Sequence, residues 1–205
     1  MEMVRSIVLL LAFAIPDPSV GQAVQRKHLI TSLGGGGGFT SIHNTTDSLA
    51  GSGIATGSVT FSFAYALGDR WSIGVHYDRI GSDNAGSSIA LMRFTTYMLE
   101  GTYRPWVGQR AAIETRLAIG PSVMALQSFD RALPLKATNN AAALGIRYLR
   151  LFSGGVGAFI GLEHTASNGV SVTDYEGHPI ANAANEQLQL DWNSQRLNAG
   201  LFVRF

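Results

Sequence analysis

One short segment of the chain holds the side-chain types of a hydrolase. Glu163, His164 and Ser167 supply a carboxylate, an imidazole and a hydroxyl, the groups that a serine nucleophile and its base provide. Catalysis needs the imidazole within hydrogen-bond reach of the hydroxyl. Successive side chains of a strand point to opposite faces, so His164 and Ser167 are predicted to point away from each other. Only a β-bulge between them would bring them together.

Other groups that could do chemistry are few. His76 and Asp78 share one face of a predicted strand, but two ligands are too few to hold a metal ion. The run of five glycines at 34–38 is not followed by the Lys and Ser or Thr of a phosphate-binding loop. We therefore expect no metal and no cofactor. The segment 173–179 mixes aromatic and charged residues in a predicted loop and is a candidate for surface binding.

The elements that carry these residues are predicted to be strands. In residues 58–67, apolar side chains at every odd position alternate with small or polar ones, which is the period of a strand with one apolar face. Gly68 and Asp69 predict a tight turn. Further strands are predicted at 71–78, 89–103, 111–123, 142–148, 156–162 and 197–205. Arg93 interrupts the alternation in its strand.

An opening strand at 28–42 brings the predicted number of strands to eight. It contains the glycine run 34–38. Glycines within a strand allow another backbone to approach closely, as a narrow barrel requires. The alternative is that the glycines form a linker, which would leave seven strands.

The face opposite the apolar one collects the charged residues. Acidic and Arg side chains are nearly balanced there, and an eight-stranded barrel is just wide enough for side chains to fill its interior. We therefore predict an interior charge network that closes the lumen, with a narrow polar channel as the alternative. The predicted members of this network are Glu114, Arg116, Arg147, Glu163 and Arg196. Other residues expected to face the interior are His76, Asp78, Glu100, Asn198 and Arg204.

The connections between the predicted strands alternate in length. Short connections fall near 68–69, 104–109 and 153–155, and longer polar ones fall near 43–53, 81–88, 128–139 and 168–189. This alternation is typical of outer-membrane barrels, which have short periplasmic turns and longer extracellular loops.

The amino-terminal residues have the pattern of a secretory signal peptide. Arg5 precedes an apolar run at 7–15, and small residues follow with Ala23 at a suitable cleavage position. The run is shorter than the roughly 20 residues that a membrane-spanning helix needs. We expect a signal peptide at 1–23, with cleavage after Gly21 as the alternative, and a single barrel domain at 24–205.

Composition excludes several classes of function. The chain has no cysteine, which rules out a disulfide framework and thiol chemistry. Its net charge of +1 gives no reason to expect nucleic acid as a partner.

The closing segment 197–205 alternates apolar with polar or small residues, with Phe202 as the exception on the other face. It resembles the terminal strand of bacterial outer-membrane β-barrels, in which a final Phe and the apolar residues before it are read by the barrel-assembly machinery. The resemblance implies that Leu201, Val203 and Phe205 form this assembly signal.

The resemblance also implies the fold and its setting. The chain is similar to small outer-membrane proteins of the OmpA-transmembrane, OmpX and OmpW kind. We therefore expect an all-β fold, an eight-stranded antiparallel transmembrane up-and-down β-barrel in the cell outer membrane. The implied partners are outer-membrane lipids, lipopolysaccharide and the assembly machinery, and the chain is expected to be a monomer.

The expected role is structural or in surface interaction, with weak porin-like passage of small solutes as an additional possibility. One alternative rests on the segment 163–168, which resembles the His-x-Ser-Asn segment of outer-membrane lipid A deacylases. It departs from that pattern because its spacing is His-x-x-Ser. A second alternative is a secreted soluble β-barrel that binds a small hydrophobic ligand, in which the apolar face would point inward.

Overall fold

The computed structural model describes residues 27–44, 51–83, 89–128, 135–153, 155–181 and 185–205. The strands in this part of the chain are β1 (Leu29–Asn44), β2 (Gly51–Ala66), β3 (Trp71–Asp83), β4 (Ile89–Val107), β5 (Ala111–Ser128), β6 (Leu135–Ser153), β7 (Val156–Thr173) and β8 (Gln189–Arg204). No helix long and apolar enough to cross a membrane occurs in the residues described. The expected signal peptide, 1–23, lies outside them.

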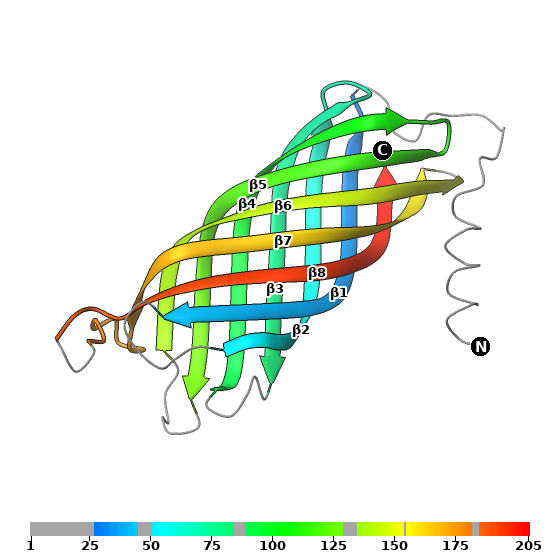
Figure 1. Cartoon of the computed structure of the whole chain (residues 1–205). Coiled ribbons are helices and arrows are strands. Elements are labelled where there is room, and N and C mark those ends of the chain that lie inside the picture. Colours follow the sequence, from blue (N-terminus) through cyan, green and yellow to red (C-terminus); the bar gives the residue numbers. More distant parts are fainter. Residues whose placement is uncertain (1–26, 45–50, 84–88, 129–134, 154, 182–184) are drawn as a thin grey trace, which may run out of the picture.

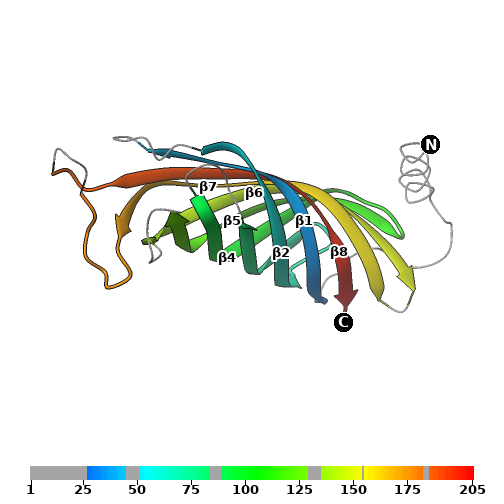
Figure 2. The ribbon, with the colours of Figure 1, turned by 90° about the horizontal axis from the view of Figure 1, so that it is seen from below.

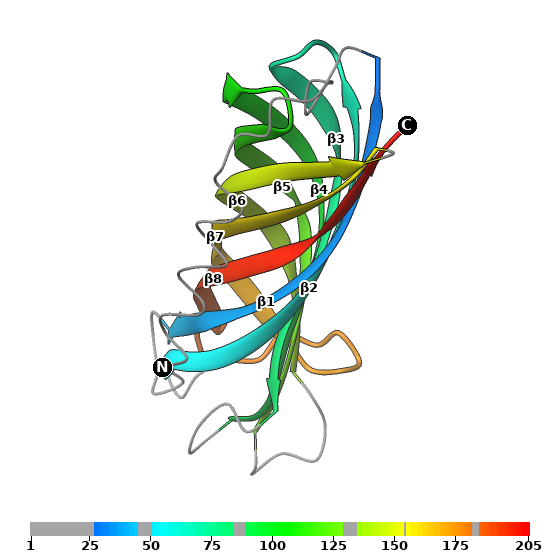
Figure 3. The same cartoon turned by 90° about the vertical axis from the view of Figure 1, so that its right-hand side faces the viewer.

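The eight strands form one closed barrel (Figure 1). Each strand pairs antiparallel with the next one in sequence, and β1 also pairs with β8, from Ile30↔Arg204 to Asn44↔Leu190. Figures 2 and 3 show the strands crossing the barrel at a steep tilt, as closure of a sheet requires. The predicted eight-stranded antiparallel up-and-down barrel is confirmed.

The strands are longer than the sequence pattern predicted. β2 begins at Gly51 instead of residue 58, and β8 begins at Gln189 instead of 197. Much of the four segments predicted as long loops is therefore strand, and the prediction of their bounds is wrong. β4 likewise continues to Val107, so the connection to β5 is 108–110 instead of the predicted 104–109.

The polarity of the inward and outward side chains changes along the barrel axis, which explains the error in strand length. In the half of the barrel nearer the short turns, apolar residues such as Tyr77 face outward and polar ones such as Asp78 face inward. One step toward the long loops this distribution of polar and apolar side chains reverses. The polar Arg79 is exposed on the outside, and the apolar Ile80 is buried inside. The inward side chains of the loop-side half include Ile42, Ile54, Ile80, Met92, Phe94, Met124, Leu126, Val170, Val172, Leu190 and Trp192.

The outer wall of the other half is a belt of exposed apolar side chains. Its members include Leu33, Phe61, Phe63, Ile73, Val75, Leu99, Leu117, Ile119, Leu144, Ile146, Leu162, Leu197 and Leu201. Apolar surface of this extent is covered only when it contacts lipid or another protein. The belt and the half above it therefore divide the barrel into a section with an apolar outer wall and a section with the polarity of a water-soluble protein.

The glycine run lies inside β1, and its even-numbered members face the lumen. A Cβ at Gly38 would overlap the carbonyl oxygen of Gln195 and lie 2.7 Å from the Cα of Arg196 on β8. A Cβ at Gly36 would overlap the carbonyl oxygen of Leu197. The expected close approach of backbones is confirmed, and the linker alternative is wrong because residues 34–38 pair on both sides.

Candidate functional site in the barrel lumen

The lumen is filled in three layers along the barrel axis. The loop-side layer is the apolar cluster that includes Phe94 and Trp192, whose rings stack with centroids 4.2 Å apart. The turn-side layer is a smaller apolar cluster of Ala66, Ala112, Leu149, Leu151, Phe159 and Phe202. Phe202, the exception in the closing strand, is at an inward position of β8, and its side chain belongs to this cluster. Between the two layers lies a charged layer, which we call the lumen network.

The lumen network consists of side chains from six strands. Its members are His76 and Asp78 on β3, Glu100 and Arg104 on β4, Glu114 and Arg116 on β5, Arg147 on β6, Glu163 on β7 and Arg196 on β8. Each is placed inward by the alternation of its strand. The four acidic and four Arg side chains can neutralise one another, which burial of charge demands.

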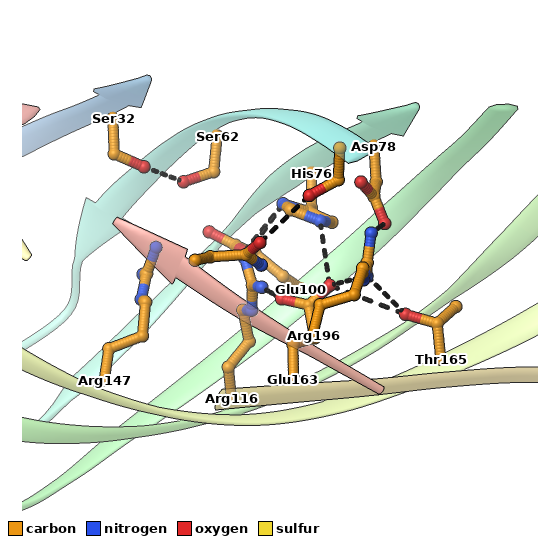
Figure 4. A network of polar contacts seen from close by, with 12 residues as sticks. Ser32, Ser62, His76, Asp78, Glu100, Arg116, Arg147, Glu163, Thr165 and Arg196 are labelled. Carbon is orange, nitrogen blue, oxygen red and sulfur yellow. Dashed lines mark hydrogen bonds and ion pairs between the residues drawn. The ribbon is translucent and has the colours of Figure 1, made fainter. Parts of the chain in front are cut away.

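Glu163 is the centre of one half of the lumen network (Figure 4). Its carboxylate forms ion pairs with Arg116 and with Arg196. Arg196 also pairs with Asp78, with 2.5 Å between Nη1 and Oδ2, and donates a hydrogen bond of 2.8 Å to Thr165. The side chains of Arg196 and Asp78 are fully buried, so this half of the network has no access to solvent.

Glu114 is the centre of the other half. Its carboxylate pairs with Arg104, with 2.8 Å between Nη2 and Oε2, and with Arg147. Arg104 also donates a hydrogen bond of 2.7 Å to the hydroxyl of Ser72. The guanidinium of Arg147 lies 5.2 Å from the ring centre of Phe159, which joins the network to the turn-side apolar layer.

His76 lies beside Arg116, which fixes the hydrogen on its ring. Arg116 Nη1 is 2.9 Å from His76 Nδ1. A guanidinium only donates, so Nδ1 must accept. The hydrogen of the imidazole is therefore on Nε2, which lies 3.9 Å from Glu163 Oε1.

Three residues of the lumen network could each offer one ligand to a metal ion. His76, Asp78 and Glu163 have ligand atoms within 4.8 Å of one another. The sequence paired only the first two, because Glu163 is on a distant strand. Arg116 and Arg196 already contact these carboxylates, so a cation would compete with guanidinium groups for them.

The structure places all five predicted members of the network, Glu114, Arg116, Arg147, Glu163 and Arg196, in this layer. Arg104 is an additional member that sequence analysis missed. Sequence analysis places it in the connection predicted at 104–109, whereas it lies in β4 and shares the inward parity of Glu100. Of the residues expected to face the interior, Asn198 is buried and accepts a hydrogen bond of 3.0 Å from Ser58.

The chain is similar to solved structures of bacterial surface and outer-membrane proteins. The crystal structure of Neisserial surface protein A (NspA) is similar with a TM-score of 0.62 and 11% identity, over 87% of this chain and 97% of that one. The crystal structure of OprG from Pseudomonas aeruginosa is similar with a TM-score of 0.51 and 13% identity, over 88% of this chain and 97% of that one. The sequence matches no protein-family model and no curated protein.

The chain has the fold of the small outer-membrane β-barrels. The resemblance inferred from the closing strand is confirmed at this level. The belt of exposed apolar side chains is an independent observation that fits the same setting, because outer-membrane barrels present such an apolar band to lipid. Fold and belt together indicate an outer-membrane protein.

The candidate hydrolase residues lie on opposite faces of the barrel wall, one outside and one inside. His164 is exposed on the outer wall, whereas Ser167 is buried and donates a hydrogen bond of 2.7 Å to the carbonyl oxygen of Asn140. Pairing with β8 is regular from His164 to Ser167, and the register shifts only beyond Ser167. The predicted separation is confirmed, and no bulge brings the two groups together.

The described part of the connection between β7 and β8, residues 174–181 and 185–188, holds an exposed polar cluster. The carboxylate of Asp174 accepts hydrogen bonds of 2.9 Å from the backbone N–H groups of Glu176 and His178. The backbone N–H of His178 is the main cause that lowers the pKa of Asp174 below its usual range. These bonds account for the clustering of Asp174, Glu176 and His178 as a local turn. His43 on β1 is paired with Asp191 of β8 and is exposed on the outer wall.

Of the predicted assembly residues, Leu201 and Val203 lie on the outer wall of β8, and Phe205 follows its last residue. Leu201 and Phe205 are exposed, by 58% and 70%, and Val203 between them is partly exposed. Their strand pairs with both β1 and β7. In the folded barrel these side chains therefore point away from the lumen.

Proposed function

We propose that this chain is an integral outer-membrane barrel with a structural and surface-interaction role, and that its lumen does not conduct solutes. The observation that carries the proposal is the lumen network. Its ion-paired side chains come from six strands and exclude solvent from the middle of the barrel. The two apolar layers on either side of it add further barriers to ions.

The loop-side half of the barrel supports the surface role. Its strands continue beyond the belt, with apolar side chains packed inside and polar ones outside. A packed interior keeps a wall rigid, and loops on a rigid scaffold are well placed to bind partners. The described part of the connection between β7 and β8, with its exposed polar cluster, lies at the end of this platform.

The alternatives receive no support from particular contacts. A soluble barrel for a hydrophobic ligand would need its apolar face inside at mid-height, where this barrel has the lumen network. A lipid A hydrolase would need His164 and Ser167 on one side of the wall.

The closed lumen predicts the electrical behaviour of the protein. In planar bilayers, the refolded full chain is expected to give no discrete conductance steps, because paired side chains block the lumen. A general diffusion porin, reconstituted in the same bilayers, provides the positive control. Insertion is checked by gel electrophoresis in SDS with and without boiling, since a folded barrel changes its mobility on heating. Reproducible steps from heat-modifiable protein would contradict the closed lumen and favour porin-like passage.

We also propose that Leu201, Val203 and Phe205 are read by the barrel-assembly machinery. Their outward position supports this, because their side chains are available to another protein before lipid covers them. The variant Phe205→Ser is expected to reduce the amount of assembled barrel in outer membranes several-fold. The same variant should refold in detergent like the unchanged chain, because Phe205 is not part of the packed interior.

Phe152→Ser provides the matched control for this prediction. Phe152 is also an exposed Phe, by 43%, but it lies on β6, outside the proposed assembly strand. Heat-modifiable protein in isolated outer membranes is the quantity to compare. Equal amounts for Phe205→Ser and Phe152→Ser would show that only lipid contact matters at these positions.

A further inference from the structure

Two arginines lie side by side on the outer wall, where its side chains change from apolar to polar. Arg79 on β3 is paired with Thr95, and Arg93 on β4 is paired with Gly81. Arg79 and Arg93 are therefore diagonal neighbours on the same face, within reach of one ligand. Both are exposed. Among the described residues, neither forms an ion pair or a side-chain hydrogen bond.

A hollow in the outer wall lies next to this arginine pair. Its volume is about 410 Å³, and Gly57, Gly81 and Asp83 are among its lining residues. Gly57 and Gly81 contribute no side chains, so the guanidinium groups border open space. Asp83 is the acidic residue at this hollow, and it forms no ion pair with either arginine.

An aromatic pair and an apolar groove continue from the arginines toward the short turns. Tyr77 and Tyr97 are paired directly across β3 and β4, with ring centres 5.3 Å apart. Beyond them, a groove of about 490 Å³ is lined by Phe61, Val75, Tyr77, Tyr97, Leu99 and Ile119, among others. Cationic, aromatic and apolar surfaces thus follow one another along the barrel axis.

A third cation extends the basic surface. Arg93 is paired with Ala125 on β5, and Ala125 is paired with Lys136 on β6. Lys136 is exposed on the same outer face. The wall formed by β3–β6 therefore carries three exposed cations at the level where the belt ends.

We propose that this surface binds a phosphorylated membrane lipid, with its phosphate between Arg79 and Arg93 and its acyl chains in the groove below Tyr77 and Tyr97. The inference rests on the proposed membrane setting. Guanidinium groups recognise phosphate through paired hydrogen bonds. Aromatic side chains mark the level at which head groups meet the hydrocarbon region. The groove lies on the hydrocarbon side of that level, which favours a lipid over free phosphate.

The test uses lipids that differ only in phosphate. The refolded full chain is titrated in detergent micelles with diphosphoryl lipid A and with its dephosphorylated form, and bound lipid is counted by native mass spectrometry. We expect tighter binding of the diphosphoryl form. Arg79→Gln and Arg93→Gln should each weaken that binding about fivefold, and the double variant about 30-fold, as for basic residues near an anionic surface. Asp83→Asn should strengthen it.

Arg70→Gln is the matched control, because Arg70 is exposed in the turn at the opposite end of β3. It should leave the affinity unchanged. Equal affinity of the two lipid A forms for the unchanged chain, or unchanged affinity in the double variant, would overturn the proposal. Competition by inorganic phosphate at the lipid's own concentration would also overturn it, since the groove would then contribute nothing. A heat-dependent mobility shift of the same samples shows whether the barrel itself is intact, so failure of this inference is distinguishable from failure of the membrane setting.

Discussion

Replacing Glu163 by Ala is expected to lower the free energy of unfolding by about 3–5 kcal/mol, the cost of leaving buried charges without their partner. Glu163 contacts both Arg116 and Arg196. Without Glu163, Arg196 would keep its ion pair with Asp78. Arg116 would keep its hydrogen bond to His76 and an ion pair with Glu100, with 3.4 Å between Nη1 and Oε2. The variant therefore leaves an excess of positive charge in the closed middle layer.

Urea unfolding of the refolded barrel, followed by Trp fluorescence, measures this loss. Glu176→Ala is the control, because the Glu176 side chain is 53% exposed in the last loop. Its effect should stay within about 0.5 kcal/mol. Glu163→Gln should lose less than Glu163→Ala, because the amide oxygen can still accept hydrogen bonds from one arginine.

The size of the loss also tests whether the lumen is closed. If water entered the middle layer, it would solvate Arg116 and Arg196 and reduce the penalty. A loss below about 1 kcal/mol, as for solvent-exposed ion pairs, would therefore contradict the closed lumen as well as the energetic role of Glu163. The conductance measurement and this variant thus address the same feature by independent means.

The sequence predicted the barrel because alternation is a local property. Each strand in the lipid-facing half repeats apolar-out and polar-in, and eight such segments with alternating connections allow one closed arrangement. The parity of Glu114 and Glu163 gave their inward direction in the same way. Which arginine each would contact depends on the stagger of the strands, and alternation within one strand carries no information about stagger.

The strand ends could not be predicted because the apolar positions of a strand face outward in one half of the barrel and inward in the other. Beyond Tyr77, apolar side chains such as Ile80 face inward. The alternation of apolar and polar residues therefore shifts by one position within one strand. Arg93 interrupted the predicted pattern of its strand for this reason. Because polar side chains face outward beyond the belt, Arg93 fits the regular pattern of that section of the barrel.

This shift in the pattern also connects the fold to the proposed lipid site. A barrel that continues beyond the hydrocarbon region must change its outer wall from apolar to polar at the head groups. Cations are the residues that gain from anionic lipid at that level. Arg79 and Arg93 lie at this change, one step beyond the aromatic pair. Their position is therefore determined by the same boundary that ends the belt.

Gly38→Ala is expected to prevent normal closure of the barrel between β1 and β8. The added methyl would overlap the Gln195 carbonyl oxygen and lie 2.7 Å from the Cα of Arg196. Both atoms belong to the backbone, so relief requires the two strands to move apart. We expect a loss of about 3 kcal/mol or more, at the upper end of overpacking effects. Gly36→Ala should behave similarly, because its methyl would overlap the Leu197 carbonyl oxygen.

Gly37→Ala separates this steric effect from the general cost of replacing a glycine. Gly37 lies between the two lumen-facing glycines but points outward, and its added methyl would be 3.5 Å from the Thr56 carbonyl oxygen, an ordinary contact. Its barrel should therefore refold and shift on heating like the unchanged protein, whereas Gly38→Ala should show little folded band in cold SDS. Comparable behaviour of the two variants would mean that β1 and β8 can separate easily, and that the glycine run does not act through close packing. A stable Gly38→Ala barrel would also require Arg196, whose backbone lies against this position, to be held less tightly in the lumen network than its contacts indicate.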